Sequence, residues 1–229
     1  VSKKAENVDT SKERVKGIDI SADGVQDNSP KFSRASNKQD QTDSPEFKAW
    51  FGKSVVTEDG KAGGKPLVVY HGTPDATFNI FRPEQYFSDK GDIASIYTGT
   101  SASSIATKPK EGNAPAVYPV YLKIEKPFDT RIPANRKIFE NEFYYKYGTG
   151  TPLTERGLPD WTDAIDLAEW INETGKDFDG LIVDEGGLPQ NDGSIMSRGI
   201  SYIPLHGNAQ IKSAIGNNGN FDATNPDIR

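Results

Sequence analysis

The sequence of 229 residues contains no cysteine. A chain without thiols has no thiol nucleophile, no thiolate metal site and no disulfide, and it fits a reducing compartment. The sequence also lacks any run of 18 apolar residues, and its N-terminus is polar. We therefore expect neither a membrane span nor a signal peptide.

The sequence has fewer basic than acidic residues: 27 lysines and arginines and 33 aspartates and glutamates give a net charge of −6. No long basic run occurs, which argues against a nucleic-acid backbone as the main partner, although an acidic enzyme can still act on nucleic acid. Apolar residues make up 34% of the sequence, a low share for a wholly globular chain. Part of the chain is therefore expected to stay outside any core.

The most polar part is residues 1–44, in which lysine, aspartate, serine, asparagine and glutamine dominate. Eight acidic and eight basic residues make this segment neutral. It carries too little apolar surface to offset its conformational entropy, so we predict a disordered or linker segment. A targeting or partner-binding arm is the alternative. Residues 45–229 form the predicted folded domain.

Two segments carry clear helix signals. Residues 45–51 follow Ser44, which suits an N-cap, and they place three aromatic side chains on one helical stripe. Residues 161–174 form the second predicted helix, with Asp160 as its cap and Gly175 at its end.

Apolar and β-branched runs predict a larger number of strands. They lie at residues 67–70, 117–124, 178–184, 200–205 and 210–214. The helices are few and do not alternate regularly with these strands, so the pattern favours an α+β fold over a doubly wound sheet.

The first strand, 67–70, ends in His-Gly-Thr at residues 71–73, where a glycine lets a ligand approach the backbone. Tyr86 and Phe87 are predicted to form the end of a strand, and Tyr97 lies eleven residues after Tyr86, on a short helix that Asp89 can cap. Taken singly, such a histidine is often a satisfied polar residue and such tyrosines are often core aromatics. The information lies in their order.

In this order the motifs resemble the ADP-ribosyltransferases of the diphtheria-toxin and poly(ADP-ribose) polymerase group. The sequence is most similar to the ADP-ribosyltransferase domain of phage and mobile-element polyvalent proteins, and the resemblance covers residues 45–229. The segments that carry it recur there in the same order: residues 47–54, 69–73, 178–180, 210–214, 219–222 and 225–228.

The resemblance implies a split β-sheet cleft that binds NAD, with short peripheral helices around it. It implies that His71 hydrogen-bonds the adenosine-side ribose and that Gly72, next to Thr73, offers its backbone to the nicotinamide carboxamide. Tyr86 and Tyr97 would bracket the nicotinamide, a flat cationic ring that aromatic faces attract. No metal and no nucleophilic side chain is required.

One position departs from the family pattern. Many relatives carry a glutamate at the start of the late strand, and here that position is Ser201, which can hydrogen-bond a ribose hydroxyl but carries no charge. Gln210 is the other polar candidate, with a structural role as its alternative. The resemblance therefore implies a catalytic set of His71, Tyr97, Ser201 and Gln210.

These features predict an NAD-dependent mono-ADP-ribosyltransferase, an enzyme of the glycosyltransferase class that releases nicotinamide. We expect a toxin-like effector that acts as a monomer in the cytoplasm of a bacterial host. The expected acceptor is a host protein, with nucleic acid as the second choice. Two alternatives stay open within a larger polyvalent protein: a catalytically weak module that binds NAD or ADP-ribose, and an NAD glycohydrolase.

Overall fold

The structure is a computed structural model. The predicted segment 1–44 lies outside the described residues except for 40–44, and so do Asp160 and residues 161–163 of the second predicted helix. The residues that the structure describes are 40–76, 78, 80–100, 108–109, 111–144, 164–184, 188–189, 195–196, 199–215, 217, 219, 221–225 and 227–229.

The helices are short. The α-helices are α1 (Pro45–Phe51), α2 (Gly91–Ile96), α3 (Pro133–Ile138) and α6 (Ala164–Thr174), and α3 continues into η2 (Phe139–Tyr144). Single 3₁₀ turns form η1 (Gln41–Asp43) and η3 (Gly207–Gln210). The prediction for α1 is confirmed in detail, since Ser44 accepts a hydrogen bond from the backbone N–H of Phe47 and Gly52 ends the helix.

The strands form one large sheet and a small hairpin. In the sheet the order is β4-β5-β8-β2-β1-β3-β9, and within it only β4 and β5 are parallel. The hairpin pairs β6 (Leu188–Pro189) with β7 (Ile195–Met196). The strands of the sheet are β1 (Val69–Thr73), β2 (Phe87–Ser88), β3 (Ala116–Leu122), β4 (Pro127–Asp129), β5 (Gly180–Asp184), β8 (Ile200–Pro204) and β9 (Ile211–Ser213). The predicted α+β class is confirmed.

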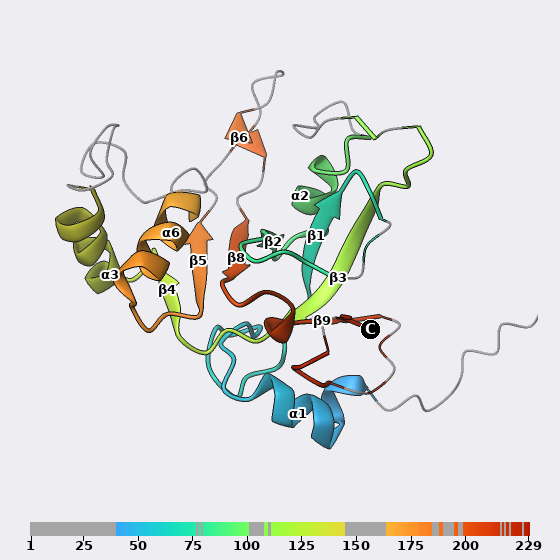
Figure 1. Cartoon of the computed structure of the whole chain (residues 1–229), viewed down its shortest axis with the longest axis horizontal. Coiled ribbons are helices and arrows are strands. Elements are labelled where there is room, and N and C mark those ends of the chain that lie inside the picture. The colour runs from blue at the N-terminus through green and yellow to red at the C-terminus, as the bar shows by residue number, and fades with distance from the viewer. Residues whose placement is uncertain are drawn as a thin grey trace, which may run out of the picture. The chain divides into compact units, whose positions relative to one another are not determined.

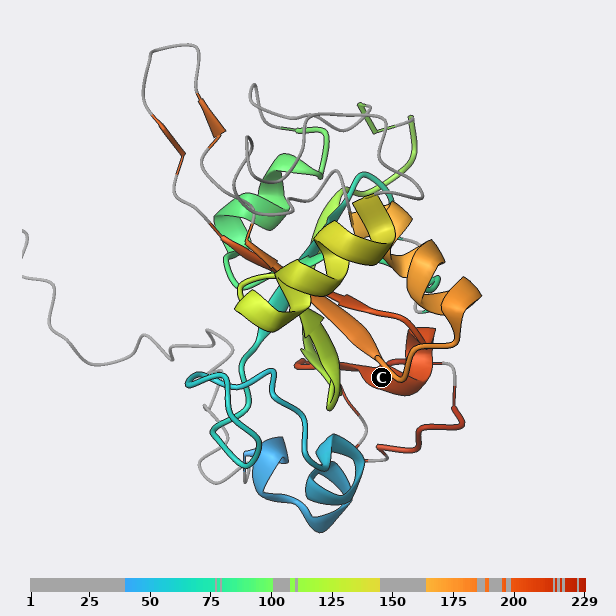
Figure 2. The same cartoon turned by 90° about the vertical axis from the view of Figure 1, so that its left-hand side faces the viewer.

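One face of the sheet is covered by α6 at the β4–β5 end (Figures 1 and 2). Trp170 of α6 belongs to the same buried cluster as Leu181 of β5 and Ile203 of β8. Side chains along a strand alternate between faces, so Ser201 lies on this face together with Ile203. The start of β8 therefore lies on the helix-covered face.

The same face continues across the sheet to β1. Ser201 of β8 pairs with Ser88 of β2, and Ser88 pairs with Tyr70 of β1. Gly72 follows Tyr70 by two residues and therefore lies on the same face, where it contacts α2. Helices α2 and α6 thus cover one face of the sheet, α2 beside β1 and α6 beside β5 (Figure 1).

The opposite face is covered by loop residues instead of helices. Val69 of β1 and Phe87 of β2 share a buried cluster there with Val56, Phe81 and Ile228, which come from loops. None of the helices among the described residues has the length and apolar character needed to cross a membrane.

Two local predictions were wrong. β1 does not end before the His-Gly-Thr motif but runs through Thr73, because β3 pairs with all of it. Asp89 does not cap α2, whose N-cap is Lys90 without a side-chain hydrogen bond. The carboxylate of Asp89 accepts a hydrogen bond from Ile200 instead.

Candidate active site

The site forms where the ladder between β1 and β2 stops. β1 pairs with β3 along its whole length, from Val69 to Thr73, but it pairs with β2 at one position, Tyr70 with Ser88. Past this pair, backbone groups of β1 that point towards β2 lie outside the hydrogen-bonding pattern of the sheet. The two strands thus separate past this pair, within one continuous seven-stranded sheet.

Gly72 is the residue whose backbone points into the break. Successive residues of a strand direct their N–H and C=O groups to opposite sides. On β3, Pro119 accepts a hydrogen bond from Ala214 on the β9 side, so the neighbouring Tyr118 faces β1 and pairs with His71. Gly72 follows His71 and therefore directs its N–H and C=O away from β3. These two groups match a carboxamide, which presents one acceptor and one donor side by side.

Helix α2 closes on Gly72 from the helix-covered face. A Cβ atom built on Gly72 would lie 1.7 Å from the carbonyl oxygen of Ala94 and 3.2 Å from the Cβ of Tyr97. The φ angle of Gly72 is not in the left-handed region, so the position requires glycine for close approach and not for conformational freedom. The contact fixes Tyr97, the C-cap of α2, beside the backbone groups of Gly72.

Tyr86 lies across the break from Gly72. Continuing the β1–β2 register by two residues places Tyr86 opposite Gly72, and the carbonyl oxygen of Tyr86 lies 2.8 Å from Nδ1 of His71. The Tyr86 ring packs against the buried cluster under α6. The structure thus brings Gly72, Tyr86 and Tyr97 together on one face of the sheet.

His71 points to the opposite face, into a box of aromatic rings. The ring centroids of Phe81, Phe87 and Phe78 lie 5.2, 5.4 and 6.4 Å from that of the imidazole. A backbone carbonyl only accepts hydrogen bonds, so Nδ1 carries the proton that bonds to Tyr86, and the neutral ring keeps Nε2 as an acceptor. The sequence alone does not show that phenylalanines enclose His71, because this contact depends on the register of β1 and β2.

Ser201 stands at the start of β8, two strands away from Gly72 with β2 between them. It is 2% exposed and lies in register with Ser88 of β2 and Val183 of β5. The position therefore shares a face with Gly72, and it offers a hydroxyl to that face instead of a carboxylate.

Comparison with protein families identifies the family to which the chain belongs. The family model for the ADP-ribosyltransferase in polyvalent proteins matches residues 61–221, which is most of the chain. The chain belongs to this family. No curated protein and no solved structure matched it.

ADP-ribosyltransferases of this family use NAD as substrate, and the groups at the break fit its parts. The backbone of Gly72 fits the carboxamide of nicotinamide. Tyr86 packs on the same face as Gly72, and the Cβ of Tyr97 lies beside Gly72 there. The neutral Nε2 of His71 fits a ribose hydroxyl that donates a hydrogen bond. Among the described residues, no group of three or more histidine, aspartate or glutamate side chains is placed to hold a metal ion.

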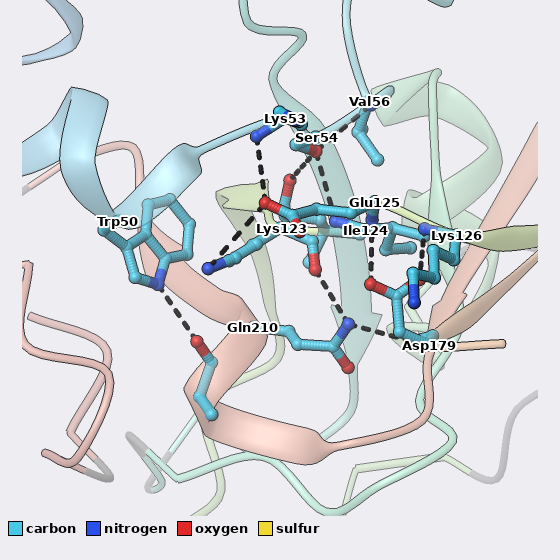
Figure 3. Close-up of polar contacts among 12 residues, drawn as sticks. Trp50, Lys53, Ser54, Val56, Lys123, Ile124, Glu125, Lys126, Asp179 and Gln210 are labelled. Atoms are coloured by element: carbon cyan, nitrogen blue, oxygen red, sulfur yellow. Dashed lines mark hydrogen bonds and ion pairs between the residues drawn. The ribbon is translucent and has the colours of Figure 1, made fainter. Parts of the chain in front are cut away.

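Thr73 and Gln210 use their polar groups inside the ADP-ribosyltransferase fold. The hydroxyl of Thr73 donates to the carbonyl of Asp75 at 3.1 Å and accepts from its N–H at 3.2 Å, which forms the turn after β1. Gln210 is 5% exposed, and its Nε2 donates to the carbonyls of Lys123 and Asp179 at 2.7 and 2.8 Å (Figure 3). We therefore assign Gln210 a structural role and leave it out of the proposed site.

The imidazole of His71 gives the ADP-ribosyltransferase a predictable response to acid. Burial lowers the pKa of His71 below its ordinary value near 6.5, and the hydrogen bond to Tyr86 opposes this shift only in part. Below pH 6.5 His71 binds a proton in the unfolded chain but stays neutral in the folded chain. The free energy of unfolding therefore falls as the pH drops from 6.5 towards the lowered pKa of His71. NAD affinity should stay level down to the lowered pKa of His71 and decline only below it.

An NMR titration of His71 checks this prediction, with the His206→Asn variant used to remove the second imidazole signal. Isothermal titration with NAD from pH 8 to pH 5 measures the affinity in parallel. An affinity that declines already above pH 6.5 would contradict the neutral, Nε2-accepting imidazole.

Proposed function

We propose that this domain is an NAD-dependent mono-ADP-ribosyltransferase that moves ADP-ribose from NAD to a macromolecule of a bacterial host and releases nicotinamide. The observation that carries the proposal is the convergence at one break in the sheet. There the backbone pair of Gly72 lies beside Tyr97 and across from Tyr86, and the carbonyl of Tyr86 sets the tautomer of His71.

In the proposed reaction the glycosidic bond between ribose C1′ and nicotinamide breaks, and its electron pair returns to the nicotinamide nitrogen. An oxygen of the acceptor bonds to C1′ and gives its proton to solvent. Gly72 holds the leaving group by its carboxamide, and the rings of Tyr86 and Tyr97 stack on its faces. Preorganised groups of this kind lower the barrier because they need no rearrangement as charge develops.

Ser201 supports the proposal of a single transfer per acceptor. A carboxylate at this position would order the ribose and assist a hydroxyl acceptor, whereas a serine hydroxyl contributes one neutral hydrogen bond. We therefore propose mono-transfer without chain elongation. A protein is the proposed acceptor and nucleic acid the second choice, since the net charge of −6 does not favour a polyanion. We further propose that the enzyme acts as a monomer in the cytoplasm of the host.

The test is incubation of the purified chain with NAD labelled in the adenylate and a bacterial lysate. We expect label on a macromolecule and stoichiometric free nicotinamide, measured by gel autoradiography and chromatography. Protease and nuclease treatment of the labelled product identifies the class of acceptor. Absence of both labelled product and free nicotinamide would defeat the proposal.

A second function is favoured by the neutral Ser201 side chain. Without a carboxylate, the same site could bind NAD without transfer, or it could pass ADP-ribose to water. Calorimetric binding without nicotinamide release selects the binding module. Label that ends as free ADP-ribose selects the glycohydrolase.

The substitution Tyr97→Ala is predicted to lower kcat/KM for nicotinamide release by about 10- to 30-fold. An aromatic face contributes about 2 kcal/mol to the binding of a desolvated cation and less to one that keeps part of its water, and about 1.4 kcal/mol corresponds to a factor of ten. Tyr97→Phe keeps the aromatic face and serves as the control, with activity within about threefold of wild type. Equal losses in both variants would show that the phenol hydroxyl matters more than the ring.

A further inference from the structure

We propose that Asp89 is a positioning residue that holds the start of β8, and with it Ser201, in place beside the NAD site. The inference rests on the proposed function and adds to it a residue that does not itself contact substrate. It is carried by two backbone hydrogen bonds, by one close glycine contact and by the place of Asp89 between β2 and α2.

Both backbone groups of Ile200 are bonded to Asp89. The N–H of Ile200 donates to Oδ1 of Asp89 at 2.9 Å, and the N–H of Asp89 donates to the carbonyl of Ile200 at 3.0 Å. Ile200 is the first residue of β8, and Ser201 follows it directly. The carboxylate therefore fixes the point at which the chain enters β8.

Gly199 allows the carboxylate to lie directly against the chain. A Cβ atom built on Gly199 would lie 3.1 Å from Oδ1 of Asp89 and 3.2 Å from Oγ of Ser88. Such distances are tighter than ordinary side-chain contacts, so an added methyl group would displace one of the two oxygens. Ser88 is also the strand partner of Ser201, so the same contact bears on both serines.

Asp89 also links two parts of the proposed site through the chain. It directly precedes Lys90, the N-cap of α2, and α2 carries Tyr97 at its far end. The strand that holds Ser201 is thereby tied to the helix that holds Tyr97. Because the bond to Ile200 needs an acceptor oxygen and not a charge, asparagine at position 89 should preserve it.

Kinetics of three variants test the proposal. For Asp89→Ala we expect kcat for nicotinamide release to fall by about tenfold, because the variant can lose no more than the one neutral hydrogen bond that Ser201 contributes. The KM for NAD should stay within about twofold, since Gly72, Tyr86 and His71, which are proposed to hold the nicotinamide and the adenosine-side ribose, are untouched. Asp89→Asn should restore kcat to within about threefold of wild type, and Gly199→Ala should resemble Asp89→Ala.

Hydrogen–deuterium exchange gives a readout that does not depend on turnover. In Asp89→Ala and Gly199→Ala, the amides of residues 200–202 should exchange faster, while those of residues 69–73 on β1 should not change. Asp92→Ala removes an exposed carboxylate of α2 whose Oδ1 accepts a hydrogen bond from the N–H of the neighbouring Ile93. It is the matched control, with unchanged kcat and unchanged exchange at residues 200–202.

The kinetics and the hydrogen–deuterium exchange together test whether Asp89 positions Ser201. Unchanged exchange at residues 200–202 in Asp89→Ala overturns the proposal, and so does faster exchange with an unchanged kcat. A loss in Asp89→Asn equal to that in Asp89→Ala would show that the charge acts and not the hydrogen bond. A wild-type chain that releases no nicotinamide defeats the proposed function and the catalytic part of this inference, while the exchange data still show whether Asp89 holds β8.

Discussion

The substitution Gly72→Ala is expected to reduce nicotinamide release by at least about 10²-fold and to lower the free energy of unfolding by about 2–3 kcal/mol. The added Cβ would lie 1.7 Å from the carbonyl oxygen of Ala94, which is a backbone atom and cannot rotate away. Helix α2 must therefore move, and Tyr97 moves with it. Urea denaturation and a continuous nicotinamide assay measure the two effects.

Gly91→Ala is the matched control for this substitution. Gly91 is the first residue of α2, and a Cβ atom there would lie 3.7 Å from the Tyr70 ring, an ordinary contact. This variant should keep full activity and gain up to about 1 kcal/mol in stability, because alanine restricts the unfolded chain. An active Gly72→Ala variant would show that α2 can be displaced without loss of the site, and the assignment of Tyr97 would then fail.

The parts of the fold that the sequence predicted well are those set by neighbouring residues. Helix α1 has its cap, its proline and its aromatic stripe within nine consecutive residues, and the structure places each as expected. The sheet was predicted as a set of apolar runs, and these runs are strands. The order of the motifs around His71 pointed to the family that the chain belongs to.

The parts that could not be predicted depend on register and on contacts between distant segments. The position of Asp89 just before α2 predicts a helix cap. In the structure, however, its Oδ1 accepts a hydrogen bond from the N–H of Ile200, 111 residues later. Gly72 was read as a site for ligand approach, and the structure shows that it also admits α2. In both cases the residue type indicated a special local role. The residues that each one contacts, however, depend on how the strands pair.

Gln210 illustrates the same limit in a catalytic assignment. A polar residue just before a late strand is compatible with a catalytic role or a structural role, and only its hydrogen-bond partners distinguish the two. Its Oε1 accepts from the N–H of His206 at 2.7 Å, and its Nε2 bridges the carbonyls of Lys123 and Asp179. The amide thus joins the end of β3 to the entry to β5, as Figure 3 shows, and it also holds the turn after β8 through His206.

Gln210→Ala is therefore expected to lower the free energy of unfolding by about 3 kcal/mol, since it leaves buried backbone groups without their partner. At a temperature where the variant stays folded, kcat for nicotinamide release should equal that of wild type. Gln210→Glu keeps the volume but replaces the donor nitrogen by an oxygen that faces two carbonyls, so it should destabilise the fold as much as the truncation does.

Ser201→Ala should show the opposite pattern, and the contrast separates a scaffold from a site. Removal of one neutral hydroxyl costs about 0.5–1.5 kcal/mol of interaction, so kcat should fall by about tenfold at most, with a smaller loss of stability than in Gln210→Ala. If Gln210→Ala lost kcat while keeping its urea midpoint, the catalytic assignment of Gln210 would be right and the structural one wrong. If Ser201→Ala lost stability instead of kcat, β8 would serve the fold alone, and water or the acceptor itself would have to order the ribose.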